Sequence, residues 1–139
     1  MDENAIDEVV GRLFHGEPTF DWVGVYVVEG DTLVLGPFRG EPPTGHERIP
    51  IPEGVCGAVV GSGETEVVPD VRARPGHIAC SLATRSEVVA PVTVDRRVVA
   101  VLDVDSDTLG AFHDREVALV ETAAAEIAAR SFASARPSA

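Results

Sequence analysis

Two cysteines are the most reactive side chains of this 139-residue chain, and they stand in different surroundings. Cys80 lies in the polar, turn-rich stretch PGHIACSLATRSEVV, close to His77 and Arg85. A core cysteine prefers apolar neighbours, whereas a nucleophilic thiolate needs partial exposure and positive or hydrogen-bonding neighbours. Cys80 is therefore a candidate nucleophile. Two interpretations remain for Cys56, near the start of a predicted short helix: a thiolate favoured by the helix dipole, or a packed and inert thiol.

Acidic side chains alternate with apolar ones in the stretch AVLDVDS. In a strand, Leu102 and Val104 face one way while Asp103 and Asp105 face the other. Two neighbouring carboxylates repel each other, which raises one pKa and favours a bound proton. The commoner meaning of such alternation is a solvated outer face, which this strand taken alone favours. Glu87 begins the strand that is expected to pair with the two aspartates.

The single tryptophan and the single tyrosine stand four residues apart, at Trp22 and Tyr26. On a regular strand this spacing places both rings on the same face. Aromatic rings with a polar tip suit a small amphipathic ligand, and they equally suit an ordinary core face. The sequence leaves these two interpretations open.

The elements that must position these residues follow from periodicity and turn residues. Helical spacing predicts an amphipathic helix over about 2–15, a short helix over 53–63 and a C-terminal helix over 113–132. Hairpins are expected over 20–40, turning at 29–31, and over 86–106, turning at 95–97, with short extended pieces at 47–51 and 65–71. Turns this short exclude crossovers, so the order predicts one α+β domain over 1–139 with an antiparallel sheet. The long loop over 70–86 carries Cys80, and a structureless stretch of this length in a compact domain is usually either functional or disordered.

Composition limits the partners. The net charge is −12, and all eleven basic residues are arginine. Nucleic acids and anionic membrane surfaces require a basic footprint, so neither is expected as a partner. No stretch approaches the roughly 18 apolar residues of a membrane span or has the pattern of a signal peptide, so we expect a cytoplasmic protein. No metal is expected either, because the chain has neither CxxC nor HxxxH spacing.

Four stretches together resemble the free methionine-(R)-sulfoxide reductases, a family of GAF-fold enzymes. They are DWVGVYVVEGDTLVLGPFRG, RIPIPEGVCGAVV, DVRARPGHIACSLATRSEVVAPV and VVAVLDVDS. The resemblance extends from about Trp22 to the last helix and implies a GAF fold, with a central antiparallel sheet flanked by N- and C-terminal helices. It also implies a protein that often forms dimers.

The resemblance implies a role for each residue singled out above. Cys80 corresponds to the catalytic cysteine and Cys56 to a second redox cysteine. The acids that hold and protonate the substrate correspond to Glu87, Asp103 and Asp105, and the aromatic wall to Trp22 and Tyr26. Many members have a third cysteine where this chain has His46, so the usual disulfide partner of the loop cysteine is replaced here.

The implied reaction reduces free methionine-(R)-sulfoxide to methionine. It converts the catalytic cysteine to a sulfenic acid, which a second thiol and a thioredoxin-type reductant return to the thiol. No bound cofactor is implied. The alternatives are a GAF module that binds or senses a small ligand without turnover, and an interaction domain with two incidental cysteines.

Overall fold

A single antiparallel sheet organises the computed structural model, which describes residues 1–43, 45–76 and 83–132. Its strands are β1 (Trp22–Glu29), β2 (Thr32–Arg39), β3 (Arg48–Pro50), β4 (Glu66–Val68), β5 (Ser86–Val94) and β6 (Arg97–Ser106). The spatial order is β3-β2-β1-β6-β5-β4, so β1 and β6 lie side by side at the centre. The helices are α1 (Glu3–Gly16), α2 (Gly54–Ser62) and α3 (Asp114–Ile127), with a short 3₁₀ helix at Val71–Ala73 and a π-helical turn at Ala128–Phe132.

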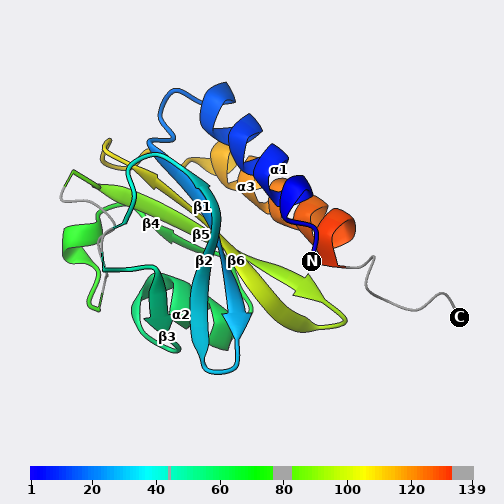
Figure 1. Cartoon of the computed structure of the whole chain (residues 1–139). Helices are drawn as coiled ribbons and strands as arrows, with labels where there is room; N and C mark the ends of the chain where they lie inside the picture. Colours follow the sequence, from blue (N-terminus) through cyan, green and yellow to red (C-terminus); the bar gives the residue numbers. More distant parts are fainter. Residues whose placement is uncertain (44, 77–82, 133–139) are drawn as a thin grey trace, which may run out of the picture.

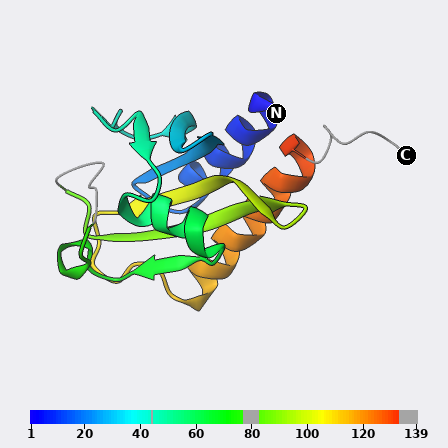
Figure 2. The ribbon, with the colours of Figure 1, turned by 90° about the horizontal axis from the view of Figure 1, so that it is seen from below.

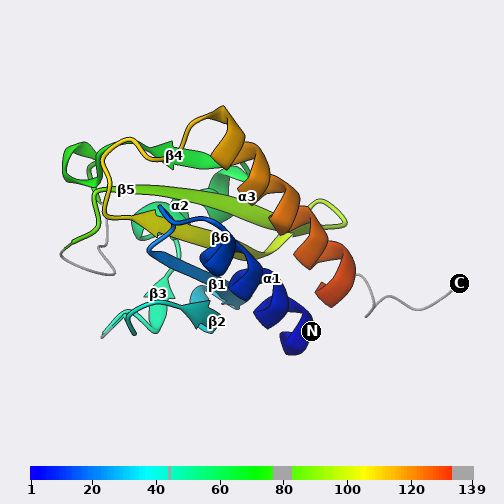
Figure 3. The ribbon, with the colours of Figure 1, turned by 90° about the horizontal axis from the view of Figure 1, so that it is seen from above.

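The helices cover both faces of this sheet. α1 and α3 lie together on one face, and α2 lies on the opposite face (Figures 1 and 3). Viewed from below, α2 stands in front of the strands while α1 and α3 lie behind them (Figure 2). The sheet therefore separates two hydrophobic clusters.

The cluster beneath α1 and α3 is formed by aliphatic and aromatic side chains of both helices and of the sheet. It contains Ile6, Val9, Val10 and Leu13 of α1 and Val120, Ala124 and Ile127 of α3, packed on alternate residues of β5 and β6 such as Val88 and Leu102. These helix positions repeat at the spacing of one helical face, which is why they meet the sheet together. The second cluster lies beneath α2 and includes Trp22, Tyr26 and Cys56.

The secondary structure agrees with most of the pattern in the sequence. The three predicted helices and both hairpins are present, and the α+β class with an antiparallel sheet is confirmed. The second hairpin turns through Asp95 and Arg96 alone, which both have positive φ, and Arg97 already belongs to β6. Two positive-φ residues match the twist of the flanking strands, so a two-residue turn replaces the predicted three-residue turn. None of the described helices is long and apolar enough to cross a membrane.

Helix α2 packs unusually closely on the chain that precedes it. A Cβ atom added at Gly57 would lie 2.5 Å from the backbone carbon of Pro52, a distance that no real contact reaches. A Cβ atom at Gly61, in the same helix, would meet nothing within 4 Å. The close approach at Gly57 fixes α2, and with it Cys56, against the segment that follows β3.

We expect Gly57→Ala to destabilise the protein by about 1–3 kcal/mol, because the added methyl group must displace backbone atoms. Gly61→Ala is the matched control, and the higher helix propensity of alanine should make it neutral or stabilising by up to about 1 kcal/mol. Urea unfolding of both variants measures the two effects. Equal stabilities for the two variants would contradict the close packing at Gly57.

Candidate active site

Three carboxyl groups meet on the α2 face of the sheet, at the end where β5 begins and β6 ends. Glu87 of β5 is paired with Asp105 of β6, and Val89 is paired with Asp103. Since alternate residues of a strand share a face, the register places Glu87, Asp103 and Asp105 together. All three are buried, with relative exposures of 2%, 1% and 2%. The favoured expectation of a solvated acidic face is therefore wrong, because α2 and the segments around it cover this end of the sheet.

Cys56 completes the cluster from the opposite side. It lies in the first turn of α2 and is 5% exposed. Its sulfur and one carboxylate oxygen each from Glu87 and Asp103 all lie within 4.8 Å of one another. Cys56 is hydrogen-bonded to Asp103, to which its thiol donates. Cys56 is thus packed, as one of its two interpretations expected, but its neighbours include carboxyl groups.

Protons are required to hold this cluster together. Burial and the charge of Asp105 raise the pKa of Glu87 well above its usual range. Burial and the charge of Glu87 do the same to the pKa of Asp103. The carboxyl groups are also hydrogen-bonded to one another. Two carboxylates cannot share a hydrogen bond unless one is protonated, so the cluster retains at least one proton in conditions where exposed carboxyl groups have lost theirs.

Trp22 and Tyr26 lie on the same face of β1, as their spacing predicts, with ring centroids 6.2 Å apart. Their polar tips bind backbone instead of pointing into open space. The indole N–H of Trp22 donates to the carbonyl oxygen of Glu41 at 2.9 Å, and the Tyr26 hydroxyl donates to that of His46 at 3.0 Å. The two rings therefore anchor the chain between β2 and β3 beside the carboxyl cluster.

Two small cavities flank the carboxyl cluster. One of about 100 Å³ is lined by Trp22 and Asp105 together with Asp21, Glu41, Ala83, Thr84 and Asp107. Burial and the neighbouring carboxylates Asp21 and Glu41 raise the pKa of Asp107. The other cavity, about 10 Å³, is lined by Cys56, Glu87 and Asp103 with Ile49, Glu53, Gly54 and Val55. Tyr26 lines neither of these two cavities, and its ring lies next to that of Trp22.

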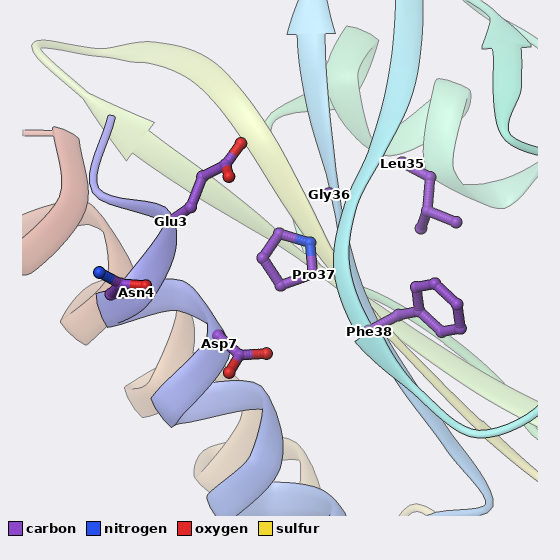
Figure 4. Close-up of a pocket in the computed structure, with 7 residues that line it drawn as sticks. All are labelled: Glu3, Asn4, Asp7, Leu35, Gly36, Pro37 and Phe38. Carbon is purple, nitrogen blue, oxygen red and sulfur yellow. The ribbon is translucent and has the colours of Figure 1, made fainter.

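A larger cavity of about 520 Å³ lies elsewhere, between the first turns of α1 and strand β2. Figure 4 shows Glu3, Asn4 and Asp7 of α1 on one side, with the ring of Pro37 turned toward them. Leu35 and Phe38 point away from the helix (Figure 4). Asp7 is held by Arg39 at 2.6 Å, which lowers the pKa of its carboxyl group. Among the residues that the structure describes, no thiol lines this cavity, and size alone does not make it the site.

The structure brings together six of the seven residues singled out from the sequence. Cys56, Glu87, Asp103, Asp105, Trp22 and Tyr26 all lie on the α2 face. Cys80 lies outside the described residues, as does His77. Sequence reasoning missed Arg74, which interacts electrostatically with Glu87 and forms a two-bond ion pair with Glu66. It also missed the carbonyl groups of Glu41 and His46, because backbone acceptors leave no signal in side-chain identity.

Comparison with known proteins places this geometry in a family. The GAF domain model matches residues 8–130. The free methionine-R-sulfoxide reductase of Escherichia coli is 44% identical over 104 residues, which are 75% of this chain and 62% of that protein. The chain belongs to the free methionine-R-sulfoxide reductase family of GAF domains.

Solved structures of this family have the same fold. The free methionine-R-sulfoxide reductase from Neisseria meningitidis, solved in complex with its substrate, has a TM-score of 0.86 at 39% identity, covering 93% of this chain and 77% of that one. The type II enzyme from Thermoplasma acidophilum has a TM-score of 0.88 at 31% identity, covering 91% and 89%. These structures confirm the family and the fold that the sequence resemblance implied. The chain spans less than two thirds of the length of the Escherichia coli enzyme.

In this chain of the free methionine-R-sulfoxide reductase family, the buried acids predict an unusual pH dependence of stability. Because the pKa values of Glu87 and Asp103 are raised by folding, the folded protein binds more protons than the unfolded chain above about pH 4–5. The free energy of unfolding should therefore fall as pH rises from about 5 to about 8. In Asp103→Asn the fall should be smaller, and the variant should be more stable than the parent at the alkaline end.

Urea unfolding across this pH range measures the effect. Glu29→Gln, which removes an exposed carboxyl group at the end of β1, is the control and should keep the parental slope. If Asp103→Asn and the parent lost stability equally with rising pH, the carboxyl cluster would not hold the extra proton.

Proposed function

We propose that this protein reduces free methionine-(R)-sulfoxide to methionine. The observation that carries the proposal is the burial of Glu87, Asp103 and Asp105 together, beside a cavity lined by Trp22 and Asp105. Burial raises the pKa values of Glu87 and Asp103. Reduction of a sulfoxide adds a proton to its oxygen, so an acid that stays protonated near neutral pH is the group the reaction needs. The family to which the chain belongs supports the same substrate.

The carboxyl cluster can bind two groups of free methionine sulfoxide, its ammonium group and its sulfoxide oxygen. An ionised carboxylate of the cluster can pair with the ammonium group of the substrate, while a protonated carboxyl group donates to the sulfoxide oxygen. The face of Trp22, held in place by its bond to Glu41, covers the apolar end. The acids would therefore serve two roles, binding and proton donation, and their coupling keeps both charge states available in one site.

Cys80 is proposed as the nucleophile, on the basis of its match to the catalytic cysteine of the family. Its thiolate attacks the sulfoxide sulfur and forms a sulfur–sulfur bond, while a protonated carboxyl group of the cluster gives its proton to the sulfoxide oxygen. The hydroxyl group then moves to the sulfur of Cys80 as the sulfur–sulfur and sulfur–oxygen bonds of the substrate break, and methionine is released. Cys80 gains the oxygen and becomes a sulfenic acid. A second thiol then displaces this oxygen as water and forms a disulfide, which a dithiol reductant of the thioredoxin type reduces to regenerate both thiols. No bound cofactor is needed for this balance.

Cys56 is proposed as the second thiol when resolution is internal. Two sulfur atoms can join only when their Cα atoms approach to about 4.4–6.8 Å. The thiol of Cys56 lies in the carboxyl cluster and so faces the same site as the substrate. An external thiol is the alternative resolving group.

Turnover with the two sulfoxide epimers tests the function. With dithiothreitol as reductant, the protein should consume L-methionine-(R)-sulfoxide and leave the S epimer largely unchanged. Cys80→Ser should lose all activity while retaining the fold. Binding of the R epimer without turnover would instead identify a sensory module and overturn the proposal.

Cys56→Ser tests how the sulfenic acid is resolved. If Cys56 is the internal thiol, the variant should lose thioredoxin-dependent turnover, and its intact mass after one equivalent of substrate should show an added oxygen. The parental protein should instead show the loss of two hydrogens that marks a disulfide. Parental rates with thioredoxin in Cys56→Ser would assign resolution to an external thiol. Ser62→Ala, at the other end of α2, is the control for local disturbance of the helix.

A further inference from the structure

The small cavity beside Cys56 has a lining that differs from that of an ordinary packing defect. Its volume is about 10 Å³, close to that of one water-sized probe. Three of its lining residues, Cys56, Glu87 and Asp103, present a sulfur atom and two carboxylate oxygens that lie within 4.8 Å of one another. Voids left by imperfect packing are apolar, whereas this one has a thiol and two carboxyl groups on its wall.

These atoms match the ligand set of a thiophilic divalent cation. Zinc takes sulfur at about 2.3 Å and carboxylate oxygen at about 2.0–2.2 Å in a tetrahedral arrangement. Neighbouring ligands around one zinc ion are then roughly 3–4 Å apart, so the three side chains need to approach one another only slightly. The exposed residue Glu53 also lines this cavity, and its side chain would be a third carboxylate and a fourth ligand.

A second observation points to a ligand at this place. The Oδ1 atom of Asp103 is completely buried, and no N–H or hydroxyl group of the described residues donates to it. A buried acceptor without a donor is costly, and a bound cation would satisfy it. Asp103 is only 1% exposed, and it borders the cavity together with the other two ligands.

We propose that Cys56, Glu87 and Asp103 form a binding site for a single thiophilic divalent cation such as Zn²⁺, and that its occupancy inhibits the reductase. The proposal of inhibition rests on the proposed function, since a cation at these groups removes the acids and the second thiol from the reaction. Magnesium and calcium are poor occupants, because they prefer six or more oxygen ligands and the cavity has room for one ion without its water shell. The site would therefore respond to zinc or cadmium and ignore magnesium.

Cadmium is the probe for the site, because its bond to a thiolate gives an ultraviolet charge-transfer band. The Cys80→Ser variant of the 139-residue chain has Cys56 as its only thiol. Titration with CdCl₂ should produce the band with one equivalent bound, and excess MgCl₂ should not reduce it. ZnCl₂ should displace the cadmium and abolish the band.

Variants of the two acids separate a built site from a lone thiol. Glu87→Gln and Asp103→Asn should each weaken cadmium binding by at least about 10–100-fold, since losing a ligand costs no less than losing an outer-shell partner. Glu64→Gln, an exposed acid beyond the other end of α2, should leave the affinity unchanged. Circular dichroism confirms the fold of each variant. The proposal is overturned by the absence of the band in Cys80→Ser, or by affinities in both acid variants equal to that of Glu64→Gln.

Inhibition has a separate readout. In the parental protein, one equivalent of ZnCl₂ should stop turnover of the sulfoxide, and a chelator should restore it fully. Unaffected turnover with zinc bound would overturn the inhibitory role. A metal-free protein without turnover would overturn the proposed function alone, because the cadmium titration requires no substrate.

Discussion

The burial of three carboxyl groups on adjacent strands is the constraint on which the site depends. Glu87, Asp103 and Asp105 are each no more than 2% exposed, and burial together with the charge of a neighbouring carboxylate raises the pKa values of Glu87 and Asp103. Such a cluster lowers stability when it is fully charged, and it persists only because the sheet holds the three positions in register. The same repulsion makes the cluster useful for chemistry. A carboxyl group that keeps its proton can donate that proton, and a carboxylate that has lost its proton can bind a cation.

The division of the sheet into two faces allows the protein to tolerate this cluster. The face beneath α1 and α3 is packed with fully buried aliphatic side chains, each worth about 1.5–3 kcal/mol of burial. That face supplies stability. The α2 face contains the three buried carboxyl groups, and it is closed by one short helix whose close contact with Pro52 leaves no room for a side chain at Gly57. The aliphatic core and the carboxyl cluster therefore lie on opposite faces of the same six-stranded sheet.

Hydrogen bonds from aromatic residues connect the site to the irregular segments around it. Trp22 and Tyr26 belong to the central strand β1. Each donates a hydrogen bond to a backbone carbonyl oxygen of the segment between β2 and β3. Ser86, the residue before Glu87, similarly donates to the carbonyl of Thr108 and accepts from the N–H of Ala111. These hydrogen bonds hold the loop segments beside the carboxyl cluster to residues of the rigid strands β1 and β5. A site lined by loops keeps its geometry in this way.

The sequence by itself determined the elements, the faces and the family. Helical spacing located α1 and α3, alternation separated Asp103 and Asp105 from Leu102 and Val104, and four motifs identified the family. Local patterns are sufficient for these inferences because side-chain direction in a helix or strand follows from backbone period alone. Only the tertiary structure decided that the acidic face is buried and that Cys56 joins it. Whether a strand face is buried depends on which element covers it. Here that element is α2, which is about thirty to fifty residues away in sequence from Glu87 and Asp103. Local spacing therefore could not predict that the sulfur of Cys56 lies within 4.8 Å of two carboxylate oxygens.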